Sequence, residues 1–127
     1  MANYTIKNLK DIGDSAASSA DVEARFARKY LDSRELGVSY FRYAPRYRST
    51  MGHSHREQEE VYVVIAGAGR VKLDDDVVEL RQWDVVRVAP EVVRAFEGGP
   101  DGLELIAVGS ARPKDGDGVP VRDWWRD

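Results

Sequence analysis

The sequence contains no cysteine and only two histidines. The absence of cysteine excludes disulfide bonds and thiolate chemistry, so nitrogen and oxygen ligands must hold any bound metal ion. No apolar run approaches the ~18 residues that a transmembrane helix needs. Residues 1–7 also lack the apolar centre of a signal peptide. We therefore expect a soluble, cytoplasmic protein with no membrane partner.

The size and charge of the chain are those of an ordinary globular domain. It has 127 residues, of which 43% are hydrophobic and 32% are charged, a balance that allows one core without a covalent staple. The net charge is −3, whereas a nucleic-acid-binding surface is basic. We therefore predict a single domain over residues 1–127 and no nucleic-acid partner.

Short strand-like segments separated by turn residues fill the middle of the chain. Segments rich in β-branched and aromatic residues lie at 38–43, 59–66, 70–73, 77–80, 84–88, 92–96 and 103–108. The intervening glycines, prolines and aspartates predict a turn at 67–69, a hairpin turn at 74–76 and a loop at 97–102. Strands do not alternate with helices, and no internal repeat is present. This pattern predicts an all-β barrel or sandwich.

One helix is predicted before the strands. Ser18 and Asp21 have the spacing of a capping box, which commonly begins a helix. Val22, Phe26 and Tyr30 then recur at every fourth position and form one apolar stripe. We expect an N-terminal α-helix over about residues 19–31 that packs against the barrel.

The C-terminal tail, residues 110–127, has the composition of a loop but ends in two tryptophans, Trp124 and Trp125. An exposed pair of tryptophans is unfavourable because both rings carry large apolar surfaces. We expect this tail to dock on its own barrel or on a second subunit.

The two histidines, His53 and His55, stand just before the segment 59–66. In a strand, residues i and i+2 point to the same face, so both rings can aim at one point. A short turn can return the carboxylate of Glu60 to that point. Two imidazoles and one carboxylate are the ligands of the facial triad that binds Fe(II), and zinc and manganese sites use the same ligand types. His53, His55 and Glu60 are therefore the predicted metal ligands.

The same segment resembles the first motif of the cupin superfamily, a Gly, then His-x-His, three or four residues, Glu, six residues and Gly. His53, His55, Glu60 and Gly67 match this spacing, while the family's leading Gly lies farther upstream than Gly52. The resemblance extends over about residues 38–109. It implies an all-β fold, the cupin double-stranded β-helix or jelly-roll barrel. It also implies a small-molecule ligand inside the barrel and, for an enzyme, a metal-dependent oxygenase, isomerase or decarboxylase.

The chain departs from the family's second motif, in which a further histidine reaches the metal after a Gly-Asp turn and a proline turn. Trp83-Asp84 and Ala89-Pro90 stand at these turns, and Arg94 stands at the place of the histidine. The resemblance thus implies that a permanent cation points toward the predicted metal site.

Two arrangements follow from this departure. In the first, the three ligands bind a divalent ion (Fe, Mn, Zn or Ni), and Arg94 grips an anionic group of a substrate. In the second, the barrel is free of metal, and Arg94 pairs with Glu60 or Glu59 or binds an anion without catalysis. A purely structural or dimerising module is a third possibility.

The aromatic residues that could line a ligand pocket are Tyr40, Tyr43, Tyr62, Trp83 and Phe96. Tyr62 and Phe96 are the two predicted to contact the ligand. Tyr62 shares the face of Glu60, and Phe96 shares the face of Arg94. Together with Arg94 they favour an anionic or aromatic small molecule as the ligand. A homodimer is also expected, because small cupins commonly pair through their outer strands.

Overall fold

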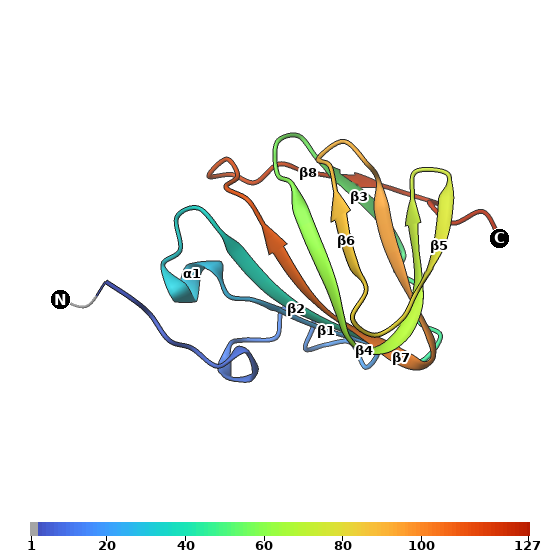
Figure 1. Cartoon of the computed structure of the whole chain (residues 1–127), viewed down its shortest axis with the longest axis horizontal. Helices are drawn as coiled ribbons and strands as arrows, with labels where there is room; N and C mark the ends of the chain where they lie inside the picture. The colour runs from blue at the N-terminus through green and yellow to red at the C-terminus, as the bar shows by residue number, and fades with distance from the viewer. Residues whose placement is uncertain (1–2) are drawn as a thin grey trace.

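A computed structural model describes residues 3–127. These residues form one antiparallel sheet of eight strands that curls into a half-barrel (Figure 1). The elements in chain order are the 3-10 helix η1 (Leu9–Asp11), β1 (Val22–Phe26), α1 (Arg28–Leu31), β2 (Gly37–Tyr43), β3 (Gly52–His55), β4 (Glu60–Leu73), β5 (Asp76–Leu80), β6 (Val85–Val88), β7 (Arg94–Gly109) and β8 (Gly118–Val121).

The two longest strands, β4 and β7, organise the sheet. The second half of β7 pairs with β2 on one side and with the first half of β4 on the other. The first half of β7 pairs with the second half of β4, and its first residue, Arg94, also pairs with His53 of β3. β5 and β6 each pair with β4, while β1 extends the sheet beyond β2 and β8 extends it beyond β3.

The predictions of a turn at 67–69 and of a loop at 97–102 are wrong, because both segments lie within long strands. β4 and β7 bend together there: Gly69 pairs with Gly98 and Gly67 pairs with Leu103, so residues 99–102 leave the ladder. Gly67 and Gly102 have φ of +72° and +85°, a conformation that side chains disfavour. The glycines therefore bend the paired strands without ending them, which closes the half-barrel.

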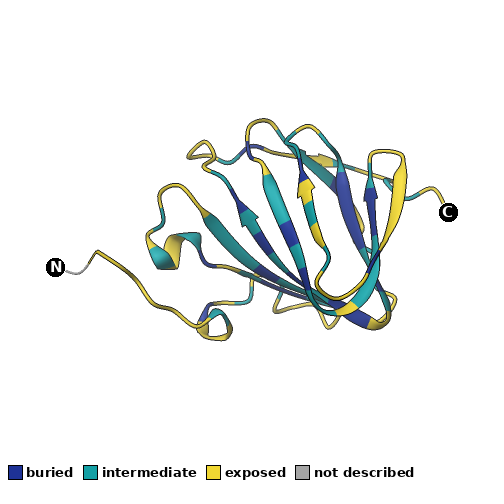
Figure 2. Ribbon diagram, in the orientation of Figure 1, coloured by how far each residue is buried: buried dark blue, intermediate teal, exposed yellow. Residues whose placement is uncertain are grey.

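Buried residues recur along these strands and form the core (Figure 2). The buried cluster consists of Tyr62, Val64, Val71, Leu80, Val88, Phe96, Leu103, Leu105 and Ala107. The side-chain parity of β4 sends Glu60 to the same face as Tyr62 and Val64, as the sequence predicts. The candidate site thus sits at one end of the apolar core.

The predicted N-terminal helix over residues 19–31 is wrong for most of its length. Residues 22–26 form β1, antiparallel to β2, and only one helical turn, α1, follows. Val22, Ala24 and Phe26 also alternate with charged residues, so they fit the two-residue period of a strand. The edge of β2 satisfies their backbone groups, and Phe26 packs edge-to-face on Phe41 with ring centroids 5.5 Å apart. This pairing with a distant strand overrides the local helical pattern.

The C-terminal tail docks on its own barrel, one of the two outcomes expected for it. β8 pairs with β3 along its whole length. Beyond it, the Trp125 indole N–H donates to the Ser49 carbonyl at 2.9 Å, and Lys72 Nζ donates to the Trp124 carbonyl at 2.6 Å. Gly52 makes room for this docking, since a Cβ there would lie 2.8 Å from Trp124 Cγ. Across residues 3–127, no helix has the length and apolar character to cross a membrane.

Candidate metal centre

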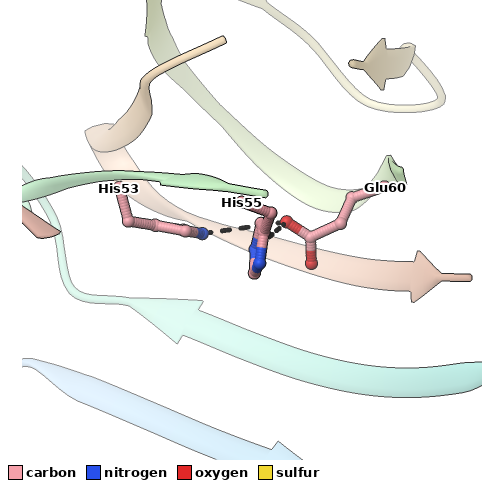
Figure 3. Close-up of side chains that lie close together, drawn as sticks. All are labelled: His53, His55 and Glu60. Atoms are coloured by element: carbon pink, nitrogen blue, oxygen red, sulfur yellow. Dashed lines mark ion pairs between the residues drawn. The ribbon is translucent and has the colours of Figure 1, made fainter. Parts of the chain in front are cut away.

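The three predicted ligands converge at the meeting point of β3, β4 and β7 (Figure 3). His53 and His55 alternate with Ser54 on β3, so both rings leave the same face of the strand. Glu60 is the first residue of β4, and the short connection of residues 56–59 brings it back beside them. One ligand atom from each residue lies within 4.8 Å of the other two, a spacing that a single ion can bridge.

Glu60 Oε1 is the common point of the cluster. It lies 3.1 Å from His55 Nε2 and 3.7 Å from His53 Nε2, and the two imidazole rings meet edge to face at 5.0 Å. His55 is 10% exposed and Glu60 is 15% exposed, but His53 is 43% exposed. The cluster is therefore enclosed on the side of His55 and open on the side of His53.

His55 Nε2 provides the test of whether a cation fits this site. It is buried and has no hydrogen-bond partner among the described residues, even though Glu60 Oε1 lies 3.1 Å away. A neutral imidazole nitrogen with a free lone pair repels a carboxylate oxygen at that distance. A proton or a metal ion between them removes the repulsion, so the donor set fits a divalent cation.

The pKa shifts of His55 and Glu60 also indicate that the cluster favours a positive charge. The Glu60 carboxylate, helped by Asp117, raises the pKa of His55 above its usual range against the opposing effect of burial. Burial raises the pKa of Glu60, but its interactions with His53, His55 and Tyr62 outweigh that effect and hold the pKa well below its usual range. Glu60 is thus ionised at neutral pH, as a metal ligand must be.

Arg94 points into the barrel, and its side chain is fully buried. Its guanidinium donates to three backbone carbonyls, those of Ala89 (3.3 Å), His53 (3.4 Å) and Pro90 (3.5 Å). Glu60 Oε1 is 3.8 Å from Arg94 Nη2, too far for a hydrogen bond. The cation therefore lies next to the carboxylate while its donors are directed elsewhere; its ligand-binding role stays a prediction.

Tyr62 and Phe96 form a wall beside the cluster. The Tyr62 hydroxyl donates to Glu60 Oε1 at 2.6 Å, and its ring lies 4.8 Å from that of Phe96. Tyr43 continues the wall, stacked on Phe96 at 6.3 Å. Burial raises the pKa of Tyr62 well above its usual value, so the hydroxyl keeps its proton and remains a donor to Glu60. Trp83, by contrast, is 68% exposed and lies in a surface turn.

The structure adds a residue that the sequence reasoning missed, Asp117. It is 1% exposed, and its Oδ1 lies 2.8 Å from His55 Nδ1. Its Oδ2 accepts the backbone N–H groups of Glu57 and Gln58 at 2.8 Å each. The only signal in the sequence is an aspartate between two glycines in a polar tail, which is also the composition of an ordinary loop.

A separate hollow lies at the bend of β4 and β7. It has a volume of about 320 Å³ and is lined by Arg46, Arg70 and Glu97 among others, but by none of the three candidate ligands. Glu97 is already paired with Arg70 and Arg48 at 2.6 Å each. The converging donor atoms, and not the size of a hollow, distinguish the candidate site.

Comparisons with known proteins support the architecture. No family model matches the chain, and no curated protein matches it significantly. A cupin protein from Bacteroides fragilis has a TM-score of 0.74 and 20% identity, with 90% of this chain and 89% of that chain covered. A conserved protein from Klebsiella pneumoniae with a double-stranded β-helix domain has a TM-score of 0.72 and 16% identity, with 93% and 97% covered.

Oxalate decarboxylase from Bacillus subtilis shares the same architecture, with a TM-score of 0.75 and 17% identity over 91% of this chain. This chain spans only 32% of the length of that enzyme. At these identities the comparisons establish the fold. The curled antiparallel sheet and these structural relatives show that the chain has the fold of a small cupin domain, the double-stranded β-helix.

Proposed function

We propose that this small cupin domain binds a divalent metal ion through His53, His55 and Glu60 and holds a small organic molecule beside it. The observation that carries the proposal is the buried His55 Nε2, which faces an ionised carboxylate at 3.1 Å without a hydrogen bond. Such a pair of acceptors needs a cation between them. Three protein ligands leave open coordination positions, which is the arrangement of catalytic metal sites.

When bound, the metal would supply Lewis acidity toward an oxygen atom of the ligand. The chain's own residues would supply position and charge. Tyr62 holds the Glu60 carboxylate in place, and Phe96 packs against Tyr62 and excludes water from that side. His53 marks the open side, from which a small molecule would approach. The nearby Arg94 charge and the aromatic wall favour an anionic or aromatic ligand.

A metal-free barrel is the second candidate, because the Arg94 guanidinium already lies 3.8 Å from Glu60. In that case Arg94 balances the carboxylate, and a proton on His55 takes the place of the metal. The two candidates differ in one measurable quantity, the metal content of the purified protein. The homodimer also remains a prediction, and light scattering at micromolar concentration tests it.

The decisive experiment is metal analysis by mass spectrometry on untagged protein purified without chelators. We expect close to one Fe, Mn, Zn or Ni per chain, and none in His53→Ala or Glu60→Gln. Glu59→Gln is the matched control, since Glu59 is adjacent, exposed and paired with Arg87 on the surface. Protein that stays metal-free after incubation with Fe(II), Mn(II), Zn(II) and Ni(II) would reject the metal site and favour the second candidate.

A further inference from the structure

Asp117 links the C-terminal segment to the metal centre. It lies in the connection between β7 and β8, and its carboxylate is almost completely buried. One oxygen contacts His55 Nδ1, and the other accepts two backbone N–H groups from the connection between β3 and β4. The carboxylate thus bridges the His55 ring and the turn that returns Glu60 to the site.

The chemistry of these contacts determines which His55 nitrogen carries the proton. An ionised carboxylate only accepts hydrogen bonds, so His55 Nδ1 must donate to it. Asp117 is 1% exposed and its Oδ2 already accepts two backbone N–H groups at 2.8 Å each, contacts that favour the ionised carboxylate. The second ring nitrogen, Nε2, has no such hydrogen bond. A neutral His55 therefore keeps its proton on Nδ1 and leaves the Nε2 lone pair free.

We infer that Asp117 is a positioning residue that holds His55 as the Nδ1–H tautomer, with Nε2 aimed at the point shared with His53 and Glu60. The purpose of this arrangement, metal binding, rests on the proposed function, but the tautomer itself does not. A carboxylate behind a metal-binding histidine orients the ring and raises its basicity. Here that carboxylate comes from outside the segment that carries the three ligands.

The C-terminal segment holds Asp117 in this position. Gly118, the next residue, pairs with His55 at the start of the β3–β8 ladder. The far end of the segment is anchored where Lys72 Nζ donates to the Trp124 carbonyl and lies 4.2 Å from the Trp124 ring. Docking of residues 118–127 and the geometry of the metal centre are therefore coupled through Asp117 and His55.

Asp117→Asn tests the inference sharply because it changes one oxygen into a donor with almost no change in shape. The amide oxygen must stay toward the Glu57 and Gln58 N–H groups, since an NH₂ there would face two donors. The NH₂ then faces His55 Nδ1, which must become an acceptor. The proton moves to Nε2, the wrong tautomer for a ligand, as happens in the catalytic triad when its aspartate is replaced by asparagine.

The first measurement is the long-range ¹H–¹⁵N spectrum of the two histidines in metal-free protein, above the titration midpoint of His55. We expect a protonated Nδ1 and a bare Nε2 in the wild type, and the reverse in Asp117→Asn. The matched control is Asp115→Asn, the same change at an exposed position of the same loop, which should leave the wild-type tautomer. If the His55 ring of the wild-type protein carries its proton on Nε2, that result alone overturns the inference.

The second measurement is Zn(II) affinity by competition with a chromophoric chelator. We expect Asp117→Asn to bind Zn(II) about 10- to 100-fold more weakly than wild type, with Asp115→Asn unchanged. Equal affinity in Asp117→Asn, in a variant whose amide spectrum shows the native fold, would also overturn the inference. If the wild type shows the Nδ1–H tautomer and yet binds no metal, the proposed function fails while the role of Asp117 stands.

Discussion

The Arg94 guanidinium lies 3.8 Å from Glu60 Oε1 without hydrogen-bonding to it, and its donors are instead directed at backbone carbonyls. Arg94 therefore hydrogen-bonds the first residue of β7 to the neighbouring backbone, and its positive charge lies beside the site. The carboxylate stays available to a metal ion, but any ion that binds must overcome repulsion from the guanidinium. Two unit charges about 4 Å apart interact by about 4 kcal/mol at an effective dielectric constant of 20.

Arg94→Met should therefore tighten Zn(II) binding by at least about tenfold, which corresponds to ~1.4 kcal/mol. The metal-free variant should lose about 3–5 kcal/mol of unfolding free energy, because a buried partner of Glu60 disappears. Urea denaturation with and without Zn(II) measures both effects. Arg87→Met is the control, since the Arg87 side chain is 64% exposed. Unchanged Zn(II) affinity in Arg94→Met would mean that the guanidinium does not act on the site.

The unfolding free energy of the metal-free protein should fall both at acidic and at alkaline pH. Folding lowers the pKa of Glu60 and lowers that of Asp117 to about 2, so their contribution is present above the unfolded values near pH 4 and is lost as pH falls. Folding raises the pKa of His55, so its contribution is complete below the unfolded value of about 6.5 and is lost as pH rises through the folded value.

Unfolding free energy in the presence of a chelator should accordingly be greatest near pH 5–6, between these two limits. His55→Gln should abolish the loss on the alkaline side, whereas Asp115→Asn should retain it. Chemical denaturation at a series of pH values provides the comparison. A wild-type profile that is flat between pH 6 and 9 would contradict the raised pKa of His55.

Tyr62→Phe removes the hydroxyl that donates to Glu60 Oε1 at 2.6 Å. A hydrogen bond to a charged, buried group contributes about 1.5–3 kcal/mol, so the variant should lose roughly that much unfolding free energy. The control is Tyr4→Phe, because Tyr4 is 75% exposed and its replacement should change nothing. A variant as stable as wild type would show that solvent replaces the hydroxyl at no cost.

Gly52→Ala should displace the C-terminal tail. The added Cβ would lie 2.8 Å from Trp124 Cγ and 2.9 Å from Val93 Cγ1, and overpacking of this kind costs about 1–3 kcal/mol. We expect a shift of the tryptophan emission to longer wavelength as Trp124 becomes hydrated. Gly118→Ala is the control, because no described atom beyond its two chain neighbours lies within 4 Å of the position a Cβ would take. Identical emission spectra for the two variants would exclude the packing of Trp124 on Gly52.

Sequence reasoning located the candidate ligands because their arrangement depends on local geometry. Two residues separated by one share a face in any strand, so the rings of His53 and His55 had to converge once that segment was extended. Glu60 follows across a connection too short to carry it away. The side-chain parity of Glu60 and Tyr62 along β4 follows from the same rule.

Local sequence patterns gave the wrong prediction in two cases. In one, the same residues fit both the helical and the strand periodicity; in the other, glycines that can either end a strand or bend it were predicted to end it. Val22, Phe26 and Tyr30 match a helix, but Val22, Ala24 and Phe26 match a strand equally well, and pairing with β2 decided between them. The glycine-rich segments near residues 68 and 100 were expected to end strands. Because β4 and β7 pair on both sides of these glycines, the strands bend and continue.

The sequence by itself therefore determined the all-β class, the cupin-like spacing and the convergence of two histidines with a glutamate, since side-chain direction within a strand is a local property. The tertiary structure decided what surrounds them. His55 and Asp117 are 62 residues apart, and Arg94 finds its acceptors on two other segments. A buried polar group must find its partners wherever the fold supplies them, and no local pattern records which distant residue will provide one.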